Sequence, residues 1–198
     1  FKNGSLSIDG AAYLQTGKIA DKSVSANYFS ANINYKASTT FNTSIGFERL
    51  SGKDQNDTST DMKSFNPLYG TNHKFNGYMD YFYVGNHINS VGLTDVYVYI
   101  GYEKNKFSAK LTPHYFASAA SIYKGVEKQD NYLGTEFDFI LGYKMYDYVT
   151  VDAGFSKMFA TSSMEVLKAG NKNAGNNWAF ISIKINPNLF SNKVEAKL

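Results

Sequence analysis

The chain has no cysteine, which excludes disulfide bonds, thiolate metal sites and cysteine nucleophiles together. It also has no long apolar run, because no segment approaches the ~18 consecutive apolar residues that a membrane-spanning helix needs. Arg49 is its only arginine and the formal net charge is +3, so it offers little for binding nucleic-acid phosphates. A helical membrane protein and a nucleic-acid-binding protein are therefore excluded.

Aromatic residues are abundant instead. They make up 16% of the chain, with 16 Tyr and 15 Phe, while hydrophobic residues reach 43%. The mean hydropathy is nevertheless only −0.36. This combination is typical of a β-barrel wall, in which every apolar residue alternates with a polar one.

The dominant period of the sequence is two, which indicates β-strands. Eight segments show it: 5–16, 23–36, 40–50, 93–103, 107–119, 133–145, 149–161 and 178–186. Most match the ~9 to 11 residues that a tilted strand needs to cross a bilayer, whereas strands of soluble proteins are about half that length. We therefore expect an all-β fold, an antiparallel transmembrane β-barrel with about eight strands in this chain.

The connections between these segments support the same fold, because their lengths tend to alternate. Short turns are expected at 37–39, 104–106 and 146–148, and longer loops at 17–22, 51–92, 120–132 and 162–177. Outer-membrane barrels have short periplasmic turns and long extracellular loops. The pattern predicts barrel strands over 1–190, with 51–92 as a long extracellular loop and 191–198 as a periplasmic C-terminal tail.

Two segments have a distinctive sequence, namely IGFERLSG at 45–52 and SFNPLYGTNHKFNGYMDYF at 64–82. Together with NWAF at 177–180, they resemble the C-terminal part of outer-membrane proteins of the alginate export family. The resemblance implies a large monomeric barrel with more strands than this chain contains. It also implies a channel, which in the family's namesake exports an anionic polysaccharide through an arginine-rich lumen.

Charged residues on the polar face of the predicted strands are candidates for lining the pore. They are Lys36, Glu48, Asp95, Lys110, His114, Glu136, Asp138, Lys144, Asp152 and Lys184. One interpretation is that they pair across strands and stiffen the wall. The other is a charge filter for solutes, formed by Lys110, Asp138, Lys144 and Lys184. The mixed signs differ from a basic, alginate-binding lumen.

The aromatic-rich segment 65–82 is expected to pack against the barrel. If it folds inward, Phe65, Tyr69, His73, Lys74 and Tyr78 form a constriction. The alternative is a compact cap over the rim.

Arg49 and Lys157 lie on the apolar face near the long-loop ends of their strands. There, lipid-facing cations can extend to the membrane interface or contact lipopolysaccharide phosphates.

The sequence thus predicts a porin-like channel in the outer membrane of a Gram-negative bacterium. Small hydrophilic solutes or oligosaccharides are the expected cargo. The expected partners are outer-membrane lipid and lipopolysaccharide, with envelope proteins as a further class and no nucleic acid. The alternative is a non-conducting barrel that serves as a scaffold or interaction partner in a larger envelope complex, because eight strands closed alone leave room only for side chains.

Catalysis is not expected. The sequence contains no glycine-rich phosphate loop, zinc-ligand spacing or serine nucleophile elbow, so neither cofactor nor metal is predicted. The remaining catalytic candidates share one loop, in which Asp80 with His73 or His87 could activate water.

Overall fold

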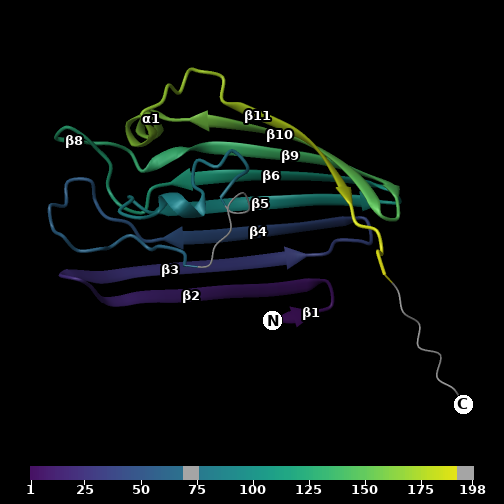
Figure 1. Cartoon of the computed structure of the whole chain (residues 1–198), viewed down its shortest axis with the longest axis horizontal. Helices are drawn as coiled ribbons and strands as arrows, with labels where there is room; N and C mark the ends of the chain where they lie inside the picture. Colours follow the sequence, from purple (N-terminus) through teal and green to yellow (C-terminus); the bar gives the residue numbers. More distant parts are fainter. Residues whose placement is uncertain (69–75, 191–198) are drawn as a thin grey trace, which may run out of the picture.

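The computed structural model describes residues 1–68 and 76–190, which form an all-β chain with one short α-helix. Nine strands make a single sheet in the order β1-β2-β3-β4-β5-β6-β9-β10-β11, and every neighbouring pair is antiparallel (Figure 1). The strands are β1 (Lys2–Asn3), β2 (Leu6–Ile19), β3 (Lys22–Tyr35), β4 (Phe41–Leu50), β5 (Leu93–Lys104), β6 (Phe107–Ala117), β9 (Tyr132–Tyr146), β10 (Val149–Ala160) and β11 (Asn177–Ile185). The all-β, antiparallel prediction is confirmed.

The eight predicted segments correspond to the eight long strands, with boundaries that differ by a few residues. The predicted loop at 17–22 is wrong. Strand β2 continues to Ile19 and β3 starts at Lys22, so the connection is a two-residue turn. Ala20 adopts a positive φ of 51° there, a conformation that Gly or Asn usually occupies. The turn position that usually carries Gly or Asn is occupied by Ala here, so the sequence does not identify the connection as a two-residue turn.

Two of the predicted loops contain secondary structure of their own. Residues 162–177 include the α-helix α1 (Ser162–Lys168), whose first turn is capped by the Thr161 side chain. The loop 120–132 contains a small hairpin of β7 (Tyr123–Lys124) and β8 (Glu127–Lys128). The loop 51–92 includes the 3₁₀ helix η1 (Val84–Asn86). The predicted tail 191–198 lies outside the described residues.

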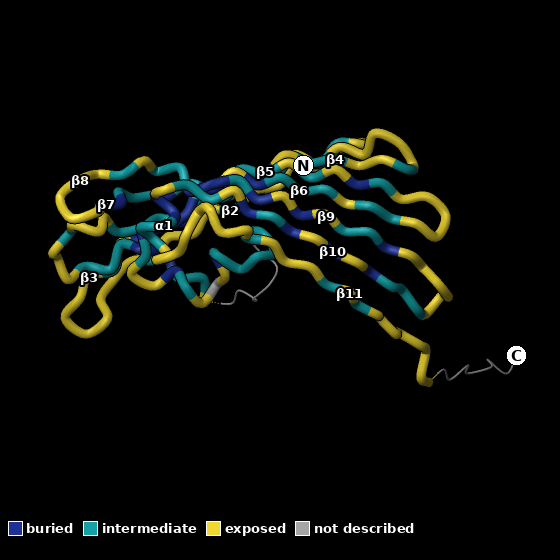
Figure 2. Tube along the Cα trace, turned by 90° about the horizontal axis from the view of Figure 1, so that it is seen from above, coloured by how far each residue is buried: buried dark blue, intermediate teal, exposed yellow. Residues whose placement is uncertain are grey.

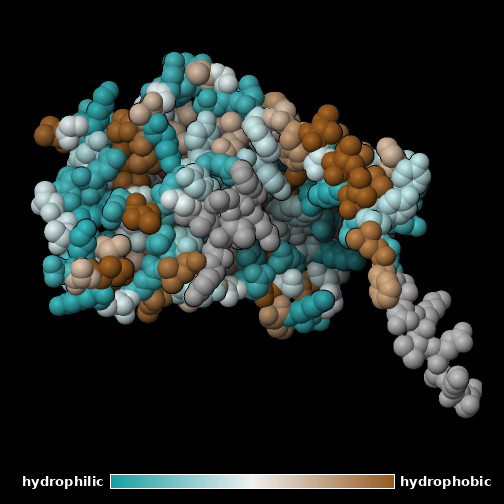
Figure 3. Space-filling view, viewed as in Figure 1, coloured by the Kyte–Doolittle hydropathy of each residue, from teal (hydrophilic) through white to brown (hydrophobic). Residues whose placement is uncertain are grey.

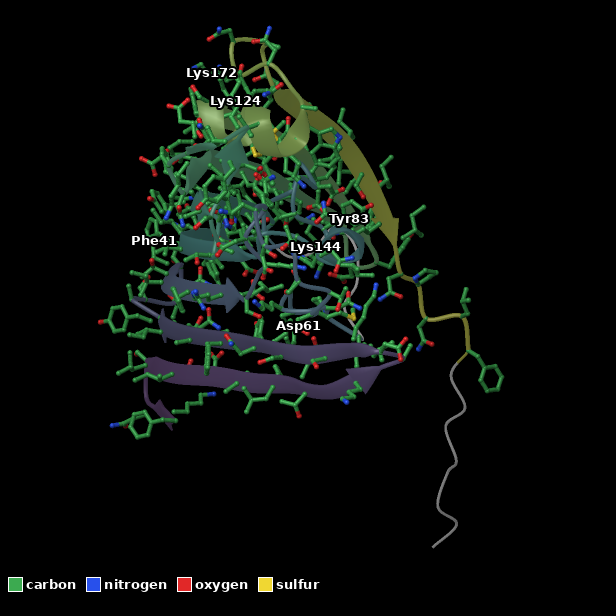
Figure 4. The ribbon with its side chains drawn as sticks, turned by 90° about the vertical axis from the view of Figure 1, so that its left-hand side faces the viewer. Phe41, Asp61, Tyr83, Lys124, Lys144 and Lys172 are labelled. Atoms are coloured by element: carbon green, nitrogen blue, oxygen red, sulfur yellow. The ribbon has the colours of Figure 1, made fainter. Side chains whose placement is uncertain are left out.

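The sheet curves into a trough and does not close (Figures 2 and 4). Within the described residues, β11 at one edge does not pair with β1 or β2 at the other. Figure 4 looks along the strands and shows Phe41 outside the arc of the sheet, whereas Lys144 and Tyr83 lie inside it. The long loops lie at one end of the trough together with the β2–β3 turn, and the turns that follow β3, β5 and β9 lie at the other end.

The convex face of the trough is apolar and exposed. Side chains that point outward from successive strands include Phe29, Ile33, Ile45, Phe47, Val98, Ile100, Tyr115, Phe137, Phe139, Phe155, Ile181 and Ile183, all at least 36% exposed. The strands alternate, so their polar residues face the concave side.

The apolar core lies on the concave side, at the long-loop end. It is formed by Ala26, Leu50, Phe65, Phe82, Val91, Leu93, Phe116, Ile122, Leu133, Met158 and Met164. Strand ends, the three loops and α1 all contribute to this core, so it fixes the loops against the inner wall. In the described part of the chain, no helix is long and apolar enough to cross a membrane.

Candidate functional site: an acidic cluster inside the trough

Four strands place charged side chains side by side on the concave face. Glu48 comes from β4, Asp95 from β5, His114 from β6, and Glu136 and Asp138 from β9. The register brings them together, because Glu48 pairs with Asp95 and His114 pairs with Glu136 across neighbouring strands. Three of the carboxylates are at most 1% exposed, namely Asp95, Glu136 and Asp138. We call these five residues the acidic cluster.

His114 links the two halves of the acidic cluster. Its Nδ1 lies 3.0 Å from both carboxylate oxygens of Asp95, and its Nε2 lies 3.7 Å from Oδ2 of Asp138. The ring stacks on Phe116 with 5.3 Å between centroids. On the other side, the Ser156 hydroxyl donates to Oδ1 of Asp138 at 2.5 Å. Contacts from four strands, β5, β6, β9 and β10, thus hold this part of the cluster in place.

Residues 76–79 of the long loop bind directly to this cluster. The Asn76 side-chain amide donates to Glu48 at 2.7 Å and to Asp95 at 3.1 Å. Two backbone amides complete the contact, that of Tyr78 donating to Asp138 at 3.1 Å and that of Met79 to Glu136 at 3.0 Å. Charge-assisted hydrogen bonds of this kind are stronger than neutral ones. We call 76–79 the docking segment.

The rest of the described loop also packs inward. Phe65 is buried against Tyr28, with 5.3 Å between ring centroids, and Phe82 packs on Phe116 at 4.7 Å. Burial raises the pKa of the Tyr78 phenol. The loop therefore lies within the trough at these points. Of the predicted constriction residues, Phe65 and Tyr78 lie on the concave side, whereas Tyr69, His73 and Lys74 lie outside the described residues.

A polar hollow of about 270 Å³ adjoins the docking segment. It is lined by three carboxylates of the cluster, His114, Asn76 and several tyrosines, including Tyr97 and Tyr99. A second hollow of about 540 Å³ extends toward the short turns, and the two share Ser44 and Tyr99 as lining residues. Figure 3 shows a recessed, mainly hydrophilic surface beside β11. Polar space thus runs along the concave face.

The other predicted pore-lining residues lie elsewhere on the concave side. Lys184 pairs with Asp152 at 2.6 Å, and Lys144 pairs with Asp147 of the adjacent turn at 3.0 Å, which lowers the pKa of Asp147. Lys36 and Lys110 are exposed. Of the predicted filter, Asp138 belongs to the acidic cluster, whereas Lys144 and Lys184 pair across strands with the same residue of β10, Thr150. The charge filter itself stays a prediction.

The two cations on the apolar face have local partners. Nη2 of Arg49 donates to the carbonyl oxygen of Ala119 at 3.4 Å, and Nζ of Lys157 lies 5.1 Å from the centre of the Phe159 ring. Both lie toward the long-loop ends of their strands, as predicted from their positions.

The docking segment itself escaped the sequence reasoning. The sequence indicates a tight turn at Gly77, but it does not single out Asn76, although the Asn-Gly pair is itself a turn signal. Ser156 and Tyr97 were not singled out either. Sequence spacing could not indicate their roles, because the docking segment contacts β9 about 60 residues away along the chain.

Within residues 1–68 and 76–190, no three His, Asp or Glu side chains are placed to hold a metal ion. Of the catalytic candidates, His73 lies outside the described residues. His87 is buried in a separate hollow beside Lys168, and burial lowers its pKa to about 4.

The fold and the cluster define an all-β chain with one open antiparallel sheet, an apolar convex face and a charged concave face. Comparisons with protein-family models and with curated protein sequences give no match. Membership of the alginate export family therefore stays a prediction from the sequence segments given above.

Proposed function

We propose that the chain forms part of the wall of an outer-membrane β-barrel channel for small hydrophilic solutes or oligosaccharides. The observation that supports the proposal best is the distribution of side chains, which is the reverse of that in a water-soluble protein. Large apolar residues cover the convex face, and Asp95, Glu136 and Asp138 are buried on the concave one. Water-soluble proteins rarely expose apolar surface over a whole sheet. A lipid bilayer would cover the convex face and leave the polar groups toward the lumen.

Strand length and the open edges support the same proposal. The eight long strands have 9 to 15 residues, enough for tilted strands to cross the hydrocarbon layer. Unpaired backbone groups at β2 and β11 cannot remain exposed to lipid, so a bilayer requires further strands to close the sheet. A barrel with more strands also has the wider lumen that transport requires.

Cysteine labelling tests the orientation of the wall, because the chain has no cysteine of its own. Tyr99 and Ile100 are neighbours on β5 that face opposite sides: Tyr99 lines the polar hollows, and Ile100 is exposed on the convex face. In outer-membrane vesicles, a membrane-impermeant maleimide should label Tyr99→Cys and spare Ile100→Cys. Unfolding in denaturant should make both variants reactive.

Equal labelling of both variants in intact vesicles would contradict the proposal, since the convex face would then be in contact with water. Conduction is tested separately, by reconstituting the complete polypeptide that contains this chain into planar bilayers. Stable openings support a channel. A lipid-embedded protein without conductance would favour the scaffold alternative.

A further inference from the structure

The carboxylates of the acidic cluster differ from other acidic groups of the chain in their partners. Elsewhere, acidic side chains pair with lysine at 2.6 to 3.0 Å: Asp57 with Lys63, Asp147 with Lys144 and Asp152 with Lys184. Among the described residues, no lysine or arginine forms an ion pair with Glu48, Asp95, Glu136 or Asp138. Among the described residues, His114 is the only ionisable base that pairs with the cluster, and it contacts Asp95 and Asp138.

Glu136 provides a second observation. Its side chain is fully buried at 0% exposure, and its Oε1 accepts the Met79 amide. Its Oε2 accepts no hydrogen bond from an N–H or hydroxyl donor of the described residues. The carboxylate lies against Gly77, which lines the hollow, and interacts with the carboxyl group of Asp138. A buried acceptor without a donor normally has an explanation such as an unseen water or ion.

The hollow next to the cluster has a matching chemistry. Glu48, Asp95 and Asp138 line it together with the rings of Tyr78, Tyr97 and Tyr99, and no lysine or arginine is among its described lining residues. Carboxylates attract cations, and the faces of aromatic rings do so as well. Charged groups beside a narrow polar passage act on ions without direct contact, because their field extends through the lumen.

We propose, resting on the channel function above, that the acidic cluster is the charge-selecting part of the lumen. It favours small cationic or amine-bearing hydrophilic solutes over anionic ones. The docking segment positions the passage over the carboxylates, and Asp95 and Asp138 set the preference. This charge preference is opposite to the one required for a polymer of uronic acids.

The test measures reversal potentials of the complete protein in planar bilayers under a KCl gradient. The wild type should be cation-selective. The double variant Asp95→Asn/Asp138→Asn should lower the K⁺-to-Cl⁻ permeability ratio by about fivefold, because each lost charge acts on the permeating ion through a screened interaction. Asp21→Asn is the control, because it removes one carboxylate by the same substitution from an exposed turn and should leave the ratio unchanged.

Liposome swelling gives a second measurement with solutes of equal size. Glucosamine should enter wild-type proteoliposomes faster than glucuronate, and the double variant should lose this difference. Heat-dependent migration on gels checks that the variants fold. Stable openings without cation preference, or a ratio unaffected by the double variant, overturn the inference while leaving the channel intact. Absence of any conductance or solute entry refutes the channel and the inference with it.

Discussion

Replacing Gly77 with alanine should loosen the docking segment from the wall. Gly77 has a φ of +86°, a region where an L side chain costs about 1–2 kcal/mol. An added Cβ would lie 2.5 Å from Oε1 and 2.7 Å from Cδ of Glu136. Because Glu136 is fully buried, its carboxylate has little room to move, and overpacking typically costs about 1–3 kcal/mol. The two effects together amount to about 2–5 kcal/mol.

This strain competes with the hydrogen bonds that hold the segment. Asn76, Tyr78 and Met79 all donate to carboxylates, and such bonds contribute about 1.5–3 kcal/mol each without being strictly additive. The strain therefore offsets one or two of these bonds but not all of them. We expect the segment to open more often while the sheet stays folded.

Hydrogen exchange at the amides of Tyr78 and Met79 measures this opening directly, because both are hydrogen-bonded in the docked state. A destabilisation of 2 kcal/mol corresponds to about 30-fold faster exchange, so Gly77→Ala should accelerate both amides by at least about that factor. The measurement uses the complete protein in lipid, with strand amides of β9 as internal reference.

Two controls separate the effect of the positive φ from the effect of the overlap between the added Cβ and Glu136. Gly125 also has a positive φ, +64°, but nothing lies within 4 Å of its added Cβ. Gly125→Ala should therefore leave the Tyr78 amide unchanged. In a Glu136→Ala background the clash disappears, so Gly77→Ala should accelerate Tyr78 by only the smaller, conformational factor. Unchanged exchange in Gly77→Ala, or equal acceleration by Gly125→Ala, would refute the reasoning.

Two further predictions concern the wall and the long loop. An added Cβ at Gly46 would overlap the ring of Tyr97, so Gly46→Ala should lower the free energy of unfolding by about 1–3 kcal/mol in thermal unfolding. Gly170 faces open space, so Gly170→Ala should leave the stability unchanged. Equal effects of the two substitutions would contradict this prediction. Burial lowers the pKa of His87 from 6.5 to about 4, so the unfolded chain binds more protons between these values. The free energy of unfolding should therefore have its full value above pH 6.5. It should fall by up to about 3 kcal/mol as the pH drops toward 4, because the unfolded chain then binds the additional proton. His87→Gln should flatten that pH dependence, and an unchanged slope would exclude His87 as its source.

Much of the fold followed from short-range patterns. Alternation along a strand depends only on backbone geometry, so the eight long strands and the face of each residue could be predicted from neighbours in the sequence. The predictions failed where no local signal exists, as at Ala20, whose positive φ is imposed by the tight β2–β3 hairpin. The helix α1 was also missed, because its seven residues are too few to show a helical period.

The candidate site was only partly predictable for the same reason. The sequence by itself determined which charged residues face the concave side, because successive side chains of a strand point to opposite faces of the sheet. Asp95, His114 and Asp138 are among them. Only the tertiary structure decided which of these residues meet. Register between strands places His114 between two carboxylates, and the fold of a long loop brings the docking segment onto them. Contacts across such distances along the chain depend on how separate elements pack, and no spacing in the sequence encodes that packing.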